Sequence, residues 1–174
     1  MSQKDTAVFR VHIKGSIEKV WNEITKTDEP QKAMFNSVMH TTRLEPGAPI
    51  RMRTVNGKHT SVVGEVIEID PPHRFVHTMR FTNYDDPPCK ITYELKEVAG
   101  GVEFTLTVDD IPLGTKSAKQ LLSGGKFIVN TLKGVVENGK PGLGVRILYQ
   151  LFKLLAPFSP AQTRSERWPL KEAR

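Results

Sequence analysis

Hydrophobic and polar residues alternate over much of the first 110 positions of this chain. In the segment AVFRVHIK, residues 7–14, every second side chain is apolar, which predicts a strand with one buried face. About six further segments between residues 37 and 110 show the same alternation, and turn signals such as Asn56-Gly57 separate them. Parallel pairing needs long crossover connections, so strands this close in sequence predict an antiparallel meander.

Helical periodicity interrupts the strands at three places before residue 140. A short helix is expected over residues 16–25, and a second one after Asp28, with Pro30 in its first turn. A long helix over residues 116–138 carries a continuous apolar stripe and ends at Asn138-Gly139. A curved sheet needs its apolar face covered, and only this helix is large enough to cover it. The pattern therefore predicts an α+β fold in which the sheet wraps around the long helix.

The segment 143–155, LGVRILYQLFKLL, stands apart from this domain. Its strongly polar residues, Arg146, Gln150 and Lys153, form one narrow stripe on a helix, so the remaining helical surface is apolar. The segment is much shorter than the roughly 20 residues needed to span a bilayer. Residues beyond 158 lack periodicity and are expected to be extended or disordered, with Trp168 as the candidate anchor. We therefore divide the chain into a domain (1–140), an apolar amphipathic helix (141–158) and a basic tail (159–174).

Three partners for the apolar surface of residues 143–155 remain open. The helix docks on its own domain, it packs against a second copy of the chain in a homodimer, or it makes peripheral contact with a membrane. The net charge of +6 is concentrated here, because residues 140–174 hold seven basic and two acidic side chains, against 18 and 17 in residues 1–139. The basic tail favours contact with a membrane, and the nearly neutral domain argues against binding of nucleic acid.

The remaining composition indicates a location. The single cysteine, Cys89, excludes an internal disulfide, and the first residues, MSQKDTAVFR, lack the apolar segment of a signal peptide. We therefore expect a cytoplasmic protein. No motif in the sequence indicates a cofactor.

Three motifs carry a resemblance to a known superfamily. They are SIEKVW at 16–21, GEVIEIDPPHRF at 64–75 and TLKGVVENG at 131–139. In this order and spacing they resemble the SRPBCC superfamily, which includes START and birch-pollen-allergen-like proteins. Within it, the chain is similar to the small proteins named after the activator of the heat-shock-protein-ninety ATPase. The resemblance covers residues 6 to about 140, and it implies a helix-grip fold with a deep cavity between sheet and long helix that takes an apolar or aromatic ligand.

The long helix departs from the pattern of these relatives. Many of them carry a Gly-Trp pair where this chain has Gly124-Gly125-Lys126. Two glycines weaken a helix by roughly 1 kcal/mol each relative to alanine. The alternative is that they leave room beside the cavity.

The inner face of the predicted sheet and the long helix supply the candidate ligand-binding residues. Among them, His77 and Tyr93 carry polar groups between apolar neighbours. Each is either a core residue that is hydrogen-bonded locally or a group that orients a ligand or moves a proton. The candidate set is Met34, Phe35, Met52, His77, Met79, Phe81, Tyr93, Phe104, Leu121 and Ile128.

These residues predict a binding protein for a small hydrophobic or aromatic ligand, which is lipid-like, polyketide-like or quinone-like. One alternative is an enzyme of the cyclase, dehydratase or isomerase kind that uses His77 and Tyr93 to handle protons. Another is lipid or quinone handling at a membrane surface through residues 143–155.

Other site chemistry has little support in the sequence. His73 and His77 have i, i+4 spacing, but on a strand they lie roughly 13 Å apart, so no metal site is predicted. The other three histidines, His12, His40 and His59, are expected to be isolated at the surface. Ser123 and Cys89 come nearest to a catalytic nucleophile, but neither lies in a recognisable motif.

Overall fold

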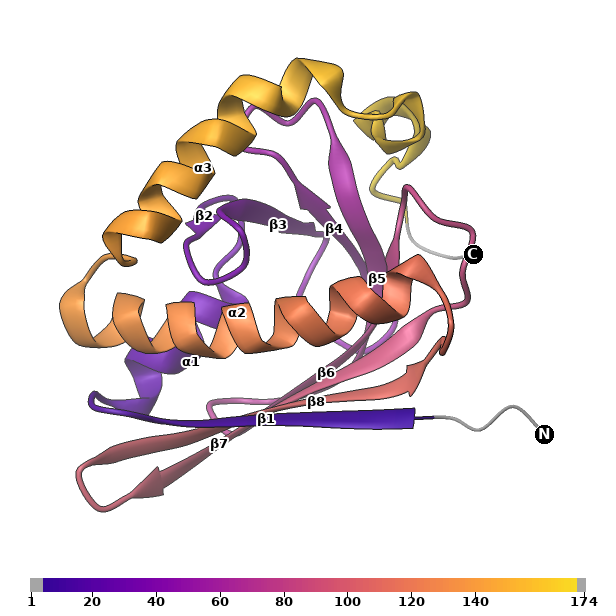
Figure 1. The fold of residues 1–174 in the computed structure, drawn as a ribbon. Coiled ribbons are helices and arrows are strands. Elements are labelled where there is room, and N and C mark those ends of the chain that lie inside the picture. Colours follow the sequence, from indigo (N-terminus) through magenta and orange to yellow (C-terminus); the bar gives the residue numbers. More distant parts are fainter. Residues whose placement is uncertain (1–4, 172–174) are drawn as a thin grey trace.

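The computed structural model describes residues 5–171 (Figure 1). Its strands form one eight-stranded antiparallel sheet in the order β1-β8-β7-β6-β5-β4-β3-β2. They are β1 (Asp5–Ile13), β2 (Pro30–Gln31), β3 (Ser37–Thr41), β4 (Pro49–Arg53), β5 (Thr60–Asp70), β6 (Arg74–Phe81), β7 (Cys89–Val98) and β8 (Gly101–Ile111). From β2 to β8 each strand pairs with the next one in sequence, and β1 closes the sheet on β8. The predicted meander is therefore confirmed.

The helices complete the predicted helix-grip fold. They are α1 (Ile17–Thr25), α2 (Lys116–Asn138) and α3 (Leu143–Leu155), followed by three 3₁₀ turns, η1 (Ala156–Phe158), η2 (Ala161–Thr163) and η3 (Ser165–Arg167). The bounds of α2 and α3 agree with those predicted from the sequence. The long helix α2 lies across the curled sheet, and α3 leaves its C-terminal end at an angle (Figure 1). The α+β helix-grip fold is thus confirmed.

The prediction of a second short helix after Asp28 is wrong. Residues 30 and 31 form β2, which pairs with β3, and the following residues turn back. Asp28, Phe35 and Asn36 have positive φ angles of 61°, 55° and 57°, which no right-handed helix accommodates. The main-chain N–H of Ala33 bonds instead to the carboxylate of Glu23, at 3.1 Å.

The core lies between the concave face of the sheet and α2. Its fully buried side chains include Phe104 on β8 and Leu132 on α2. Gly125 sits where α2 crosses β1, and a Cβ atom there would overlap the ring of Phe9. At Gly124 a Cβ would lie 3.7 Å from the ring of Phe35. The space left by Gly125 is therefore occupied by an aromatic side chain of the core.

The tail, expected to be extended or disordered, folds against the β4–β5 hairpin. The side chain of His59 lies 2.9 Å from the hydroxyl of Thr163, and the N–H of Ser165 donates to the carbonyl of Lys58. Trp168 is an anchor, as expected, because the guanidinium of Arg80 lies 5.3 Å from its ring centre. Tertiary contacts thus order residues 156–171, and residues 172–174 of the predicted tail lie outside the described part.

Candidate functional site

The structure gathers all of the predicted ligand-binding residues except Phe35 in the core beneath α2. Met34, Tyr93, Phe104 and Leu121 belong to the buried cluster; the partly buried Met52, Met79, Phe81 and Ile128 pack against it, and the ring of His77 contacts that of Tyr93. Phe35 is 40% exposed and stacks on Phe127 of α2, with the ring centres 4.5 Å apart. Phe35 therefore lies apart from the other nine.

His77 and Tyr93 lie side by side in an aromatic group with Phe75 and Phe104. The ring centres of His77 and Tyr93 are 5.6 Å apart, and those of Tyr93 and Phe104 are 5.8 Å apart. Nδ1 of His77 lies 2.8 Å from the carbonyl oxygen of Thr78, which can only accept, so Nδ1 carries the proton and Nε2 is left as an acceptor. Burial lowers the pKa of His77 to about 4 and raises the pKa of Tyr93. Both groups are neutral at pH 7.

A small hollow lies where the start of α2 meets the end of β6 and the start of β7. Met79, Phe81, Cys89 and Leu121 are among the residues around a space of about 10 Å³, which is close to the minimum for one water molecule. A ligand larger than one water molecule therefore enters this hollow only if the side chains around it move. Methionine is well suited to such rearrangement, because its side chain is unbranched and flexible.

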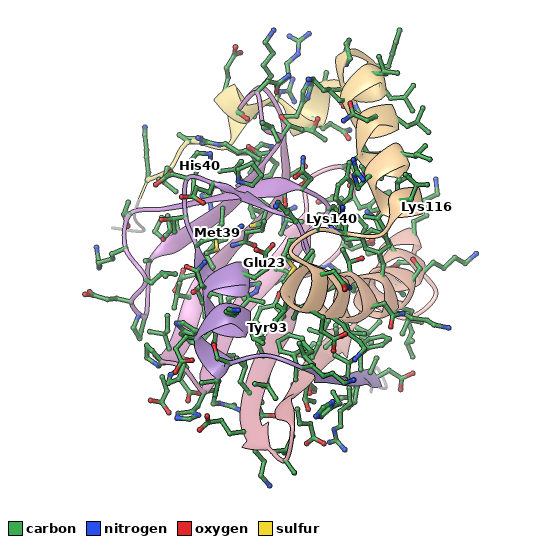
Figure 2. All side chains as sticks on the ribbon, turned by 90° about the vertical axis from the view of Figure 1, so that its left-hand side faces the viewer. Glu23, Met39, His40, Tyr93, Lys116 and Lys140 are labelled. Atoms are coloured by element: carbon green, nitrogen blue, oxygen red, sulfur yellow. The ribbon has the colours of Figure 1, made fainter. Side chains whose placement is uncertain are left out.

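A much larger hollow, of about 1080 Å³, lies between α2 and the beginning of α3. We name it the α2–α3 groove. Its lining comes from one side of α2, from the turn that carries Lys140 (Figure 2) and from the first turn of α3. It includes Lys126, Lys140 and Arg146 and no acidic residue, together with apolar surface from Phe127, Leu143 and Val145.

Sequence reasoning missed this groove. On the helix α2 alone, Lys126, Asn130, Gly134 and Asn138 repeat every four residues and have the pattern of an ordinary solvated face. The groove exists only because α3 turns back beside that face. The available signal was the coincidence of this polar stripe with a glycine-containing turn before an apolar helix.

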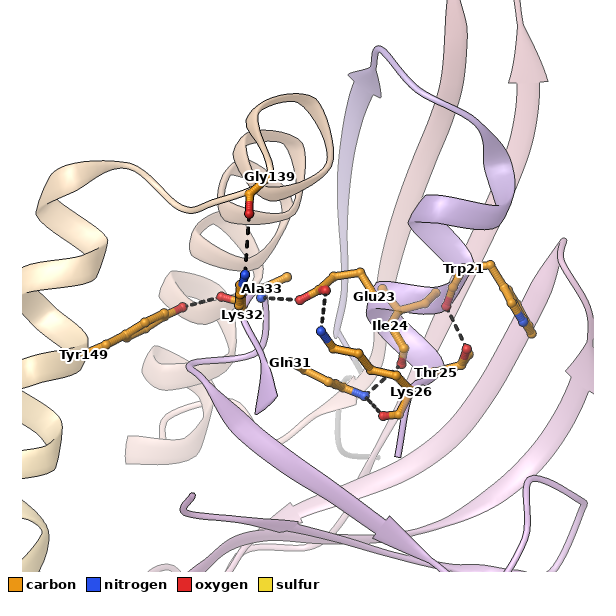
Figure 3. A network of polar contacts seen from close by, with 10 residues as sticks. All are labelled: Trp21, Glu23, Ile24, Thr25, Lys26, Gln31, Lys32, Ala33, Gly139 and Tyr149. Carbon is orange, nitrogen blue, oxygen red and sulfur yellow. Dashed lines mark hydrogen bonds and ion pairs between the residues drawn. The ribbon is translucent and has the colours of Figure 1, made fainter. Parts of the chain in front are cut away.

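Helix α3 is held at one face and open at the others. No residue of α3 is buried, and Leu143, Ile147 and Leu154 are 69%, 62% and 72% exposed. Its contact with the body centres on Tyr149, whose ring meets Phe127 edge-on and whose hydroxyl donates a 2.6 Å hydrogen bond to the carbonyl of Lys32 (Figure 3). Docking on its own domain, the first of the three alternatives, therefore accounts for only part of the apolar surface of α3.

A polar network fixes the segment on which α3 docks (Figure 3). The buried carboxylate of Glu23 on α1 pairs with Lys26 at 2.8 Å and accepts the N–H of Ala33. The amide of Gln31 donates to the carbonyl of Lys26 at 2.9 Å, and Nζ of Lys32 donates to the carbonyl of Gly139 at the end of α2. The network joins α1, the β2 segment and the end of α2, so the position of Tyr149 depends on all three.

The candidate nucleophiles have no activating partner in the described structure. The hydroxyl of Ser123 bonds back to the carbonyl of Lys119 in its own helix. Cys89 is buried, and burial raises the pKa of its thiol to about 12. Neither side chain thus has the character of a nucleophile at pH 7.

The remaining site features concern histidines, metals and membranes. His12 is exposed as expected, but His40 lies 3.0 Å from a carboxylate oxygen of Asp28, and His59 is half-buried beneath the tail. Within residues 5–171, no three His, Cys, Asp or Glu side chains gather closely enough to hold a metal ion. Each helix in that range lacks either the length or the hydropathy that a bilayer crossing requires.

Comparison with solved structures shows the same fold. The chain is similar to the Aha1 dimer from Colwellia psychrerythraea, with 19% identity over 78% of this chain and 98% of that one and a TM-score of 0.64. ChR145 from Cytophaga hutchinsonii has 21% identity over 80% and 98%, with a TM-score of 0.62. CalU16 from Micromonospora echinospora has 17% identity over 84% and 82%, with a TM-score of 0.57. At these identities the likeness shows the fold alone.

Sequence comparison supplies the family. A search of curated proteins finds no match. A family model described as activator of Hsp90 ATPase homolog 1-like protein matches residues 14–137, which include α1, the strands from β2 to β8 and all but the last residue of α2. The resemblance drawn from the three sequence motifs is therefore confirmed, and α3 lies beyond the matched region. Because the match spans most of its length, the chain belongs to the activator of Hsp90 ATPase homolog 1-like family.

Proposed function

We propose that this protein attaches peripherally to an anionic membrane surface through α3 and binds an apolar, lipid-like or quinone-like molecule there. The observation that carries the proposal is the exposed apolar surface of α3. Six large apolar side chains of this helix are exposed, namely Leu143, Ile147, Leu151, Phe152, Leu154 and Leu155, and Phe158 follows at 83% exposure. Monomeric soluble proteins rarely expose a patch of this kind unless it contacts a partner or a membrane.

Charge indicates which partner fits. Helix α3 carries Arg146 and Lys153 and no acidic residue, and their stripe runs beside the exposed apolar face. Interfacial helices have this arrangement, because the apolar face enters the acyl region while the cations meet headgroups. Each basic side chain near an anionic leaflet contributes about 1 kcal/mol of binding free energy. Binding to the cytoplasmic leaflet, which is anionic, would agree with the cytoplasmic location expected from the sequence.

A second copy of the chain is the competing occupant. The related protein from Colwellia psychrerythraea is described as a dimer. Two copies that paired through α3 would bring the cations of both helices together, and α3 offers no carboxylate to neutralise them. The charge of the helix therefore favours the membrane.

Vesicle binding tests the proposal directly. The full chain is sedimented with phosphatidylcholine vesicles that contain or lack phosphatidylglycerol, at low and high salt. Binding is expected only with phosphatidylglycerol and is expected to weaken with salt. Ile147→Asp and Leu154→Asp should each weaken binding by about tenfold or more, because burial of one such side chain contributes roughly 1.5–3 kcal/mol.

The matched control is Val8→Asp, which adds the same charge at an exposed position of β1, across the molecule from α3 (Figure 1). This variant should bind like the unaltered protein. The proposal is wrong if the unaltered protein does not bind the anionic vesicles, or if all three variants bind equally well. If the protein instead forms a dimer at both salt concentrations and does not bind vesicles, the apolar face of α3 contacts a second copy of the chain.

The core beneath α2 supports a second candidate function, binding of a small hydrophobic or aromatic ligand between the sheet and α2. The observation that favours it is the buried pair His77 and Tyr93, which offers an acceptor nitrogen and a hydroxyl inside an aromatic group. The cyclase, dehydratase or isomerase alternative uses the same pair, and the pKa of His77 near 4 makes it a hydrogen-bond acceptor rather than a strong base.

Native mass spectrometry followed by organic extraction tests binding of a ligand between the sheet and α2. A co-purifying apolar compound of defined mass supports it, and an empty protein that also fails to take up added apolar compounds contradicts it.

A further inference from the structure

Two glycines in the lining of the α2–α3 groove lie beside open space. A Cβ atom placed on Gly134 of α2 or on Gly142 before α3 would meet no other atom within 4 Å. Glycine weakens a helix interior relative to alanine, so Gly134 is a costly residue for α2 unless the open space is used. The groove is therefore accessible space that a single small side chain would reduce.

The side chains around this space carry unpaired positive charge. Lys126, Lys140 and Arg146 line the groove, and none of their side chains has an ion-pair or hydrogen-bond partner within residues 5–171. The nearby acidic residue Glu137 is already bonded to Lys133 at 2.7 Å and does not line the groove. The groove therefore favours an anionic group.

The same space has an apolar wall that continues onto the exposed face of α3. Phe127 and Val145 line the groove, and Leu143 both lines it and belongs to the exposed apolar face. A ligand that fits both features has an anionic group beside the cations and an apolar chain that follows Leu143 outward. An inorganic anion would leave the apolar wall unused.

We infer that the α2–α3 groove binds one phosphate-bearing amphiphile, with the phosphate at the basic part of the lining and the chain along Phe127 and Leu143. This inference deepens the proposed function and rests on it, because an anionic membrane presents such an amphiphile next to α3. The groove then selects the headgroup, while the outer face of α3 supplies attachment.

A soluble lipid tests the groove without a membrane. Dihexanoyl phosphatidylglycerol, below the concentration at which it forms micelles, is titrated into the full chain and followed by calorimetry and by NMR of the amides of residues 123–146. Saturable binding is expected, at least about tenfold tighter than that of dihexanoyl phosphatidylcholine or inorganic phosphate. Equal binding of inorganic phosphate, or no saturable binding of the lipid, overturns the inference.

Two matched pairs of variants locate the site. Gly134→Leu places a side chain at the lining of the groove without altering charge and should weaken lipid binding by about tenfold or more. Gly144→Leu adds the same side chain to α3 outside the lining, where a Cβ also meets nothing, and should have no effect. The charge pair compares the double variant of Lys126→Gln and Arg146→Gln with the double variant of Lys96→Gln and Lys119→Gln, which loses the same charge at exposed positions outside the groove. Only the first should lose binding, and equal losses in either pair overturn the inference.

The inference and the proposed function fail separately. The soluble lipid assay contains no membrane, so loss of vesicle binding with the soluble lipid still bound contradicts attachment through α3. Vesicle binding that persists in Gly134→Leu while the soluble lipid never binds contradicts the groove. Circular dichroism of each variant confirms that the helices remain.

Discussion

The hydroxyl of Tyr149 and the carbonyl oxygen of Lys32 are joined by a 2.6 Å hydrogen bond across 117 positions of the sequence. Lys32 in turn donates from Nζ to the carbonyl of Gly139, just before the turn into α3. One residue of the β2 segment thus holds both the end of α2 and the middle of α3. This attachment ties α3 to the body of the domain, while Leu143, Ile147 and Leu154 of α3 stay exposed.

Removal of this hydroxyl should loosen α3. In Tyr149→Phe the ring contact with Phe127 remains, and we expect the local stability of α3 to fall by about 1 kcal/mol, the usual net contribution of one hydrogen bond. Burial raises the pKa of Tyr149, so the hydroxyl remains a donor at ordinary pH. Native-state hydrogen exchange of amides 147–155 measures the change. Tyr84→Phe, on a ring that packs edge-on against Phe81, is the control, and equal protection of α3 in both variants would contradict the prediction.

Two glycines of α2 should respond oppositely to alanine. A methyl group at Gly125 overlaps the ring of Phe9, so Gly125→Ala should lower the free energy of unfolding by about 1–3 kcal/mol. At Gly134 a methyl group meets nothing, and Gly134→Ala should raise this free energy by up to about 1 kcal/mol. Urea denaturation of both variants measures the difference. A stabilised Gly125→Ala variant would show that Phe9 moves away freely.

His77 should make the protein less stable in acid. Burial lowers its pKa from 6.5 to about 4, so between these values the unfolded chain binds a proton that the folded chain does not. The stability that depends on neutral His77 is fully present above pH 6.5 and is lost as pH falls towards 4. The loss amounts to about 3 kcal/mol in the free energy of unfolding.

The measurement is urea denaturation at neutral pH and near pH 4, for the unaltered protein and for His77→Phe. The variant should lose less stability in acid than the unaltered protein, since carboxylates contribute equally to both. His12→Phe, at an exposed histidine, should lose as much as the unaltered protein. Parallel pH profiles for all three proteins would rule out a protonation effect at position 77.

The thiol of Cys89 should be chemically silent in the folded protein. It is buried, and its pKa of about 12 leaves almost no thiolate at pH 8. We expect an aromatic disulfide reagent to label it only as fast as the protein unfolds, and at once in concentrated urea. Rapid labelling of the native protein would mean that the core around Leu121 opens often, which would support ligand entry at that point.

Local patterns in the sequence determined the elements of the domain and their buried faces. The ends of α2 follow from Thr115, whose side chain caps the helix, and from Gly139, which takes the left-handed conformation at φ 73°. The alternation of β6 and β7 placed His77 and Tyr93 on one face, because side chains of a strand alternate with a period of two. These features depend on neighbouring residues alone.

Contacts between distant residues decided the rest. In the segment after Asp28, the N–H of Ala33 bonds to Glu23, and the side chain of Gln31 donates to carbonyls at the end of α1. The tail is ordered by His59 and Lys58, more than a hundred positions before it. The three cations line one groove only because α3 turns back after Gly139 and docks through Tyr149. The sequence by itself determined the helix-grip domain and the amphipathic character of α3. Only the tertiary structure decided which face of α3 is covered, because that depends on where a hydrogen-bond acceptor 117 positions away has been placed by the rest of the fold.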